Sequence, residues 1–291
     1  MLCSHFAKQN AVDPGGTALA PDVVVLVEVA EPWPKSIAKH DDLKTLCAAA
    51  AVHHEQVRLL AAVPHDAAAP RVIAFRNSPG GMTRTELALG DDHVASLQSV
   101  LSGDGSVRVE CGDDAPRTLL VCTQGSHDEC CGTDGAVLAE WVGKERPDVE
   151  LFRVSHTGGH RFAPTAMTLP DGRMWAYLTP ESTTGILDRT MEPAELAAQC
   201  RGWWGAATGA AQVGERAVFA LSDFSIDSAN RGAGVVNAGP PSRVIVEVGD
   251  TAFEVIVDAG REVPAIACGA VGDQPAKPTR EWVVLEGPNE I

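Results

Sequence analysis

At the centre of the chain stands the stretch Arg117-Thr-Leu-Leu-Val-Cys122-Thr-Gln-Gly-Ser-His-Asp-Glu-Cys130-Cys131-Gly132. Its apolar run, which ends at Cys122, predicts a buried strand, and residues 132–145 have the composition of a helix. A second apolar run, Val149–Ser155, predicts the next strand. Strand, helix and strand in this order predict a right-handed β-α-β unit, whose two parallel strands end at one edge of a sheet.

The same order of elements occurs twice along the chain. After the stretch above, we predict the strands Thr165–Leu169 and Arg173–Leu178 and the helix Pro193–Cys200. The earlier copy is predicted as the strand Val23–Val29, the helix Ser36–Val52, the strands Val57–Val63, Arg71–Arg76 and Thr83–Leu89, and the helix His93–Leu101. Corresponding elements lie roughly 90 to 100 residues apart. This order is typical of a thioredoxin-like sheet, so we predict an α/β fold with tandem thioredoxin-like domains.

The division of the chain follows from this repeat. We expect residues 1–106 and 107–205 to form the two thioredoxin-like domains, and residues 206–291 to form a C-terminal extension that packs on the second domain. The extension is predicted to contain an amphipathic helix over Ala207–Leu221 and a β-hairpin of Arg243–Val248 and Thr251–Val257, with Gly249-Asp250 as its turn. A last strand is expected over Glu281–Glu286.

Composition and charge restrict the class of protein. With 291 residues, of which 45% are hydrophobic and 21% charged, the chain has enough apolar side chains for a core. Its formal net charge of -16 argues against nucleic acid, because phosphate binding needs clustered Lys and Arg. The same charge favours docking to the basic surface of a redox partner, such as a reductase. No apolar run is long enough to span a membrane and no signal-peptide pattern occurs, so we expect a cytoplasmic protein.

Eight cysteines are spread unevenly over the chain. They stand at positions 3, 47, 111, 122, 130, 131, 200 and 268. Such spacing does not predict a disulfide framework in a chain of this size. In a reducing compartment it indicates metal binding or redox chemistry for some of the thiols.

Potential metal ligands follow both strands of the central β-α-β unit. Cys122 closes the first strand, and Cys130 and Cys131 stand where the helix begins. His156 and His160 follow the next strand. Because parallel strands end at one edge of a sheet, two thiols and two imidazoles are expected to converge there.

The spacing of these ligands distinguishes between metals. Seven or eight residues separate Cys122 from Cys130 or Cys131, whereas zinc knuckles place their cysteines about two to four residues apart. The two glycines of His156-Thr-Gly-Gly-His160 would cost a helix on the order of 2 kcal/mol, so the segment does not form a helical zinc-protease motif. Glycines instead allow close approach of the backbone to a bulky group. A [2Fe-2S] cluster with two Cys and two His ligands satisfies these features.

The same residues carry a family resemblance. The sequence at residues 122–132 and His-Thr-Gly-Gly-His-Arg-Phe-Ala-Pro-Thr at residues 156–165 resemble the signature of the sucrase/ferredoxin-like family, as do Cys3-Ser4-His5, Gly16-Thr17-Ala18 and Pro32-Trp33-Pro34. The resemblance covers most of the chain. It implies a thioredoxin-like ferredoxin that transfers electrons, with Cys122, Cys131, His156 and His160 as ligands of a [2Fe-2S] cluster. It gives no support for sucrose chemistry. Gln124 and His127 depart from the family pattern in the loop over the cluster.

Several alternatives stay open. Cys130 is the alternative to Cys131 as the second thiolate ligand. A thiol-disulfide oxidoreductase and a zinc-stabilised interaction module are the rival functions. Asp128 is expected to cap the following helix, and His127 to face water. A ligand imidazole that reaches solvent through its second nitrogen takes up a proton on reduction, so we also expect proton-coupled redox chemistry.

Overall fold

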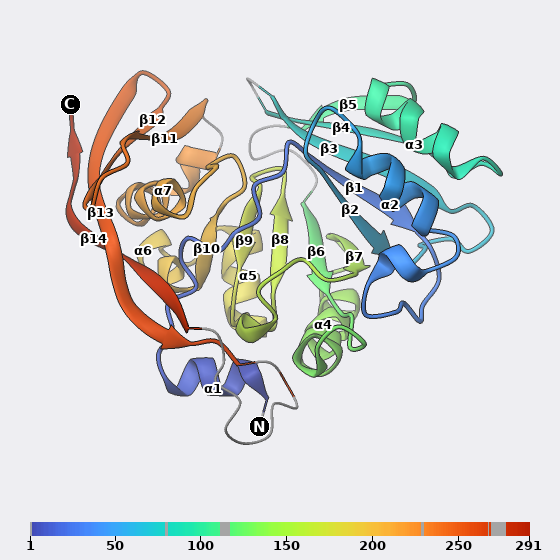
Figure 1. Ribbon diagram of the computed structural model, residues 1–291, viewed down its shortest axis with the longest axis horizontal. Coiled ribbons are helices and arrows are strands. Elements are labelled where there is room, and N and C mark those ends of the chain that lie inside the picture. Colours follow the sequence, from blue (N-terminus) through green and yellow to red (C-terminus); the bar gives the residue numbers. More distant parts are fainter. Residues whose placement is uncertain (1, 79–80, 111–116, 228–229, 267, 269–277) are drawn as a thin grey trace.

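The computed structural model describes residues 2–78, 81–110, 117–227, 230–266, 268 and 278–291, so Cys111 lies outside the described residues. The helices are α1 (Cys3–Gln9), α2 (Lys44–Ala51), α3 (His93–Ser102), α4 (Ala136–Glu145), α5 (Pro180–Asp188), α6 (Pro193–Leu196) and α7 (Gly209–Leu221). The strands are β1 (Val23–Glu28), β2 (Val57–Ala62), β3 (Arg71–Ser78), β4 (Gly81–Ala88), β5 (Ser106–Glu110), β6 (Thr118–Cys122), β7 (Glu150–Val154), β8 (Ala166–Leu169), β9 (Arg173–Trp175), β10 (Cys200–Trp203), β11 (Arg231–Asn237), β12 (Ser242–Val248), β13 (Thr251–Pro264) and β14 (Pro278–Glu290). Figure 1 shows their arrangement.

The large sheet contains the same strand pattern twice. Its order is β10-β9-β8-β6-β7-β2-β1-β3-β4-β5. In each half a parallel pair, β1 with β2 or β6 with β7, is extended by three antiparallel strands. The two halves meet where β2 pairs antiparallel with β7. The repeat predicted from the sequence is therefore present in the strand order, and both copies belong to one sheet.

A shared layer of apolar side chains joins the two halves. Alternate residues of β1 point to opposite faces of the sheet, as the period of a strand requires. Val23 and Val25 pack with α2 and α3, whereas Val24 and Leu26 belong to a cluster that also contains Leu120 of β6. This cluster includes Phe75 and Met82 of the first half and Phe152, Met167 and Met174 of the second. Hydrophobic burial thus holds the halves together where β2 and β7 pair only briefly, at Ala62 and Val154.

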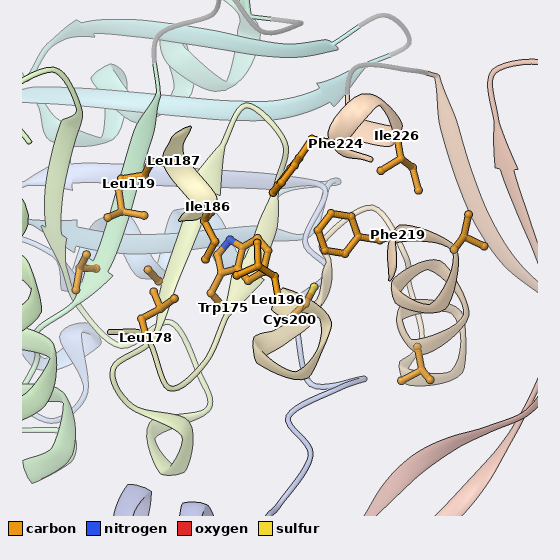
Figure 2. Packing of buried hydrophobic residues seen from close by; sticks show 14 of the residues in the cluster. Leu119, Trp175, Leu178, Ile186, Leu187, Leu196, Cys200, Phe219, Phe224 and Ile226 are labelled. Carbon is orange, nitrogen blue, oxygen red and sulfur yellow. The ribbon is translucent and has the colours of Figure 1, made fainter. Parts of the chain in front are cut away.

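The C-terminal part forms a second layer beside the large sheet. Strands β11, β12, β13 and β14 make an antiparallel sheet in chain order, with α7 packed against it. Figure 1 shows β13 and β14 running along one side of the molecule toward α1. Figure 2 shows Phe219 of α7 and the neighbouring Phe224 facing Trp175 of β9 and Leu196. The extension therefore shares its core with the second half of the large sheet.

Four buried charges lie at this junction. Arg173 of β9 donates to both carboxylate oxygens of Glu215 on α7, at 2.9 and 2.8 Å, and to Asp227 at 2.8 Å. Arg231 of β11 is the fourth charge and donates to the same Glu215 and Asp227. The side chains of Arg173, Glu215 and Asp227 are fully buried. Two guanidinium groups and two carboxylates therefore balance in charge where solvent cannot screen them.

The α/β prediction is confirmed: the described residues form a large mixed sheet with helices and a second, antiparallel sheet. The thioredoxin-like assignment and the division at residues 106 and 205 stay predictions. The helix expected over Ser36–Val52 is wrong at its start, because Ser36 and His40 have extended backbone angles and only Lys44–Ala51 is α-helical. The strand expected to reach Leu178 ends at Trp175, since Tyr177 has a positive φ of 55°.

Two further differences concern residues 180–203. The helix expected over Pro193–Cys200 ends at Leu196, and Cys200 pairs with Trp175 as the first residue of β10. Helix α5 was not predicted, although its start carries a readable signal. Thr179 and Ser182 form a capping box and Pro180 is the first helical residue. Among the described residues, no helix has the length and apolarity needed to cross a membrane.

We predict that Arg173→Met lowers the free energy of unfolding by about 3–5 kcal/mol, because it leaves two carboxylates buried without their main partner. Arg243→Met, which removes a half-exposed ion pair with Glu254, should cost at most about 1 kcal/mol. Urea unfolding of both variants measures the difference. Equal losses of unfolding free energy in the two variants would show that the buried ion pairs of Arg173 contribute no more to stability than one half-exposed pair.

Candidate metal centre

The parallel strands β6 and β7 bring the first ligands together. Cys122 and Val154 are partners in the register, and the amide of Thr123 donates to the carbonyl of Val154 at 3.0 Å. His156 follows two residues later, with its Nδ1 3.9 Å from Cys122 Sγ. Together with Cys131, these residues offer ligand atoms that all lie within 4.8 Å of one another. Two buried thiols and a half-buried imidazole thus converge at the edge predicted from the sequence.

Cys130 and Cys131 point to different neighbours. Cys131 contributes to the group with Cys122 and His156, whereas Cys130 Sγ lies 3.4 Å from Cys3 Sγ and 3.0 Å from Cys268 Sγ. Both residues stand in one irregular turn, the π-helical segment Cys131–Gly135 and the residue before it. Consecutive side chains on a helical turn diverge by about 100°. One turn therefore supplies thiols to two separate clusters.

His160 lies between these clusters. Its Nδ1 is 2.9 Å from Asp128 Oδ2 and 3.2 Å from Cys3 Sγ, and its ring centroid is 5.9 Å from that of His156. Of the four predicted ligands, Cys122, Cys131 and His156 lie together in the structure. His160 lies next to them and is paired with Asp128. With Nδ1 facing the carboxylate, Nε2 is the ring nitrogen left for a ligand.

Asp128 does more than the predicted helix cap. Its Oδ1 accepts from the amide of Cys130 at 3.1 Å, which is the expected capping contact. Its Oδ2 accepts from the amide of Cys268 at 3.2 Å as well as facing His160. Burial opposes ionisation, but the hydrogen bonds from His160 and Cys268 hold the pKa of Asp128 well below its ordinary value. The carboxylate is therefore ionised at neutral pH.

Glycines let the backbone pack closely around the thiols. A Cβ at Gly135 would lie 2.2 Å from the carbonyl oxygen of Cys122, and one at Gly132 would lie 2.5 Å from the Cα of Gly125. Gly158 and Gly159, between the histidines, have positive φ angles of 80° and 69°. Only glycine adopts such angles without strain, so the His loop cannot be helical, as predicted.

The loop after Cys122 is attached to the first half of the chain. Gln124 accepts from the amide of His156 at 2.8 Å and donates to the carbonyl of Pro34 at 2.6 Å. Ser126 donates to the carbonyl of Trp33 at 2.6 Å. The N-terminal half therefore helps to position both the cysteine loop and the histidine loop.

His127 is half-exposed to solvent, and part of its ring is covered by the protein. Its ring stacks on that of His156, with centroids 3.6 Å apart and planes at 14°, and its Nδ1 lies 3.1 Å from the carbonyl of Lys35. Burial lowers the pKa of His127. The sequence could not indicate this partial cover, because the segment that contacts the ring comes from residues about 90 positions earlier. A cavity of about 380 Å³ borders both rings and is also lined by Lys35, Arg58 and Gln124.

The two thiols of the first group shift each other's pKa in opposite directions. A hydrogen bond from the Cys131 thiol holds the pKa of Cys122 well below its ordinary value, against the effect of burial, and His156 acts in the same direction. The same hydrogen bond, together with burial, raises the pKa of Cys131. These shifts favour the thiolate form at Cys122, which is the form in which cysteine binds a metal.

Two arginines, the buried Arg201 and the half-buried Arg58, lie near this group. Arg201 of β10 donates to the carbonyl of Gly158 at 3.2 Å and to Thr17, and burial lowers its pKa to about 10. Arg58 of β2 donates to the carbonyl of His156. Neither has an ion pair among the residues that the structure describes. Both guanidinium groups attract negative charge at Cys122, so two cations without a carboxylate partner in the described parts of the chain lie near the thiols.

Sequence analysis missed these arginines and two of the clustered cysteines. Arg58 and Arg201 carry no local signal, because their role comes from strands that are distant in the sequence. Cys3 and Cys268 were noted without partners, since no spacing rule connects residues so far apart. Gln124 was noticed as a departure from a pattern, but its hydrogen bonds depend on Pro34 and His156.

Comparison with known proteins agrees with the sequence resemblance. The family model described as sucrase/ferredoxin-like matches residues 14–202. This range covers both halves of the large sheet and the groups of Cys122 and His160. Neither a curated protein nor a solved structure matches the chain.

We predict that Gly135→Ala moves the turn that carries Cys131 and costs about 1–3 kcal/mol of unfolding free energy, because the new Cβ would meet the Cys122 carbonyl. Gly143→Ala, in the same helical region, meets nothing closer than 3.7 Å and should be neutral or stabilising by up to about 1 kcal/mol. Urea unfolding and the reactivity of the buried thiols toward a disulfide reagent measure both effects. Two variants that behave alike would contradict the close packing at Gly135.

Proposed function

This chain belongs to the sucrase/ferredoxin-like family, and we propose that it is an electron-transfer protein that binds a [2Fe-2S] cluster through Cys122, Cys131, His156 and His160. The observation that carries the proposal is the convergence of Cys122, Cys131 and His156 within 4.8 Å. Two thiols and two imidazoles form a donor set that such a cluster accepts. The strand order repeated in both halves supports the reading of each half as thioredoxin-like.

The residues around the thiols fit a group that carries negative charge. A thiolate at Cys122 is compensated by half-buried Arg58 and buried Arg201, which have no carboxylate partner among the described residues. Positive charge in a site of low dielectric favours gain of an electron there. The bound cluster supplies one-electron redox chemistry at a potential above that of an all-cysteine ferredoxin.

In this proposal three further side chains orient or cover the histidine ligands. Asp128 holds Nδ1 of His160 and leaves Nε2 for ligation, the arrangement that fixes a ligand histidine in many metal sites. Gln124 accepts from the amide of His156 and so orients the histidine loop. His127 covers one face of the His156 ring and restricts access of water to it.

Partner and compartment are part of the proposal. The net charge of -16 favours a redox partner with a basic docking surface, because opposite charges speed their encounter. The seven cysteines that the structure describes are free thiols, which is consistent with a reducing compartment such as the cytoplasm.

We expect Cys131→Ser to lose the cluster and Cys130→Ser to keep it, because only Cys131 lies with Cys122 and His156. Each variant is purified anaerobically, and iron, sulfide, the visible spectrum and the EPR spectrum of the reduced protein are measured. Cys122→Ser should behave like Cys131→Ser, and Cys47→Ser, in α2, should behave like the wild type.

Other outcomes would support the rival functions. A colourless wild-type protein that holds zinc at Cys122 and Cys131 would indicate a zinc-stabilised module. A reversible Cys122–Cys131 disulfide without iron would indicate a thiol-disulfide oxidoreductase. Loss of the cluster in Cys130→Ser but not in Cys131→Ser would exchange the roles of the two thiols.

Proton coupling is tested separately. Added negative charge next to the imidazoles favours their protonated form, so the reduced protein should bind protons more tightly. The midpoint potential is then expected to fall as the pH rises, over roughly pH 6 to 10. Protein-film voltammetry at a series of pH values measures this slope, and a flat potential would reject proton coupling at His156 and His160.

A further inference from the structure

A second cluster of potential ligands lies beside the first. Cys3, Asp128, Cys130 and Cys268 offer ligand atoms that all lie within 4.8 Å of one another. Cys3 begins α1, Asp128 and Cys130 belong to the loop and turn after β6, and Cys268 lies between β13 and β14. Three of the four are buried and Cys268 is half-buried. Three segments, from near both ends and from the middle of the chain, thus bring four donor atoms to one place.

The distances between the sulfur atoms are too short for thiols that only pack against one another. Cys130 Sγ lies 3.4 Å from Cys3 Sγ and 3.0 Å from Cys268 Sγ. Around a tetrahedral zinc ion with bonds of about 2.3 Å, sulfur atoms lie about 3.8 Å apart, and in a disulfide they lie about 2.05 Å apart. A disulfide would use two of the three thiols and leave the third buried against it. A single cation can use all three.

The backbone is arranged to stabilise anionic sulfur at this place. The amide of Ser4 points at Cys130 Sγ at 3.4 Å, and the amide of Cys3 points at Cys268 Sγ at 3.2 Å. Such donors are common around metal-bound thiolates. Asp128 adds a carboxylate whose Oδ1 is 3.4 Å from Cys3 Sγ, while its Oδ2 is held by His160 and the Cys268 amide.

We propose that Cys3, Cys130 and Cys268, with Asp128 as the fourth ligand, bind one zinc ion. Three thiolates and one oxygen donor suit a thiophilic divalent ion in tetrahedral geometry, and four protein ligands close the site as in structural zinc centres. The ion links α1 and Cys268, which lies between β13 and β14, to the turn that carries Cys131. This proposal does not rest on the iron-sulfur cluster, because it uses none of the residues proposed to bind the cluster.

The site connects directly to the first cluster through Asp128. One oxygen of this carboxylate lies 3.4 Å from Cys3 Sγ, and the other faces Nδ1 of His160. Zinc bound here would therefore fix the orientation of His160 as well as the two ends of the chain.

The test measures zinc and iron in the same protein. Full-length wild type, purified with a thiol reductant, is expected to hold one zinc ion per chain by mass spectrometry of the elements. Cys268→Ser and Cys3→Ser should weaken zinc binding by more than about tenfold in competition with a chromophoric chelator, while Cys47→Ser should not change it. Cobalt exchanged into the wild type should give the thiolate charge-transfer and tetrahedral ligand-field bands, which Cys268→Ser should lose.

Three results would overturn the proposal. The first is a wild type that takes up neither zinc nor cobalt under reducing conditions. The second is a Cys130–Cys268 disulfide in the native protein, seen as a mass lower by two hydrogens. The third is zinc that persists in Cys268→Ser but disappears in Cys131→Ser, which would place the ion with Cys122. The iron content and the visible spectrum are separate readouts, so the cluster proposal can fail while the zinc site stands, and the reverse.

Discussion

The parallel register of β6 and β7 is the constraint on which the rest of the site depends. Because Cys122 and Val154 are partners, the loops that follow both strands leave the sheet at one edge. Gly135 lets the next turn pass against the Cys122 carbonyl, and Gln124 holds the histidine loop beside it. A shift of this register by one residue would turn Cys122 to the other face of the sheet and separate its thiol from Cys131 and His156.

The local part of this arrangement could be predicted from the sequence. Apolar runs and their order indicated the β-α-β unit, and the ends of its strands indicated where Cys122 and His156 meet. The sequence could not indicate that Cys130 and Cys131 diverge, because that depends on a π-helical turn. It also could not predict the contacts of Cys3, Cys268, Arg58 and Arg201, since these arise from segments that meet only in the folded chain. Helix α5 was missed although the capping box at Thr179 indicates where it begins. By contrast, no sequence pattern indicated that β2 and β7 join both halves in one sheet.

Buried charge is used in two different ways in this protein. Arg173 and Arg231 are matched by Glu215 and Asp227, so the charges at the junction of the two sheets balance within the protein. Arg58 and Arg201 contact carbonyl groups, and no ion pair of either occurs in the described parts of the chain. Burial of an unbalanced cation is costly unless an anion is provided from elsewhere. The charges of the first set are thus neutralised within the protein, whereas the charges of Arg58 and Arg201 are matched by no carboxylate among the residues that the structure describes.

The contact between Cys3 and Cys268 joins residues 265 positions apart. At about 5–20 residues per second of synthesis, Cys3 waits on the order of tens of seconds before Cys268 exists. Until then Cys3 and Cys130 lack their third thiol, and a chain that stops early never acquires it. The cluster of three thiols therefore forms only in chains whose translation has passed residue 268, and a chain truncated before that residue lacks it.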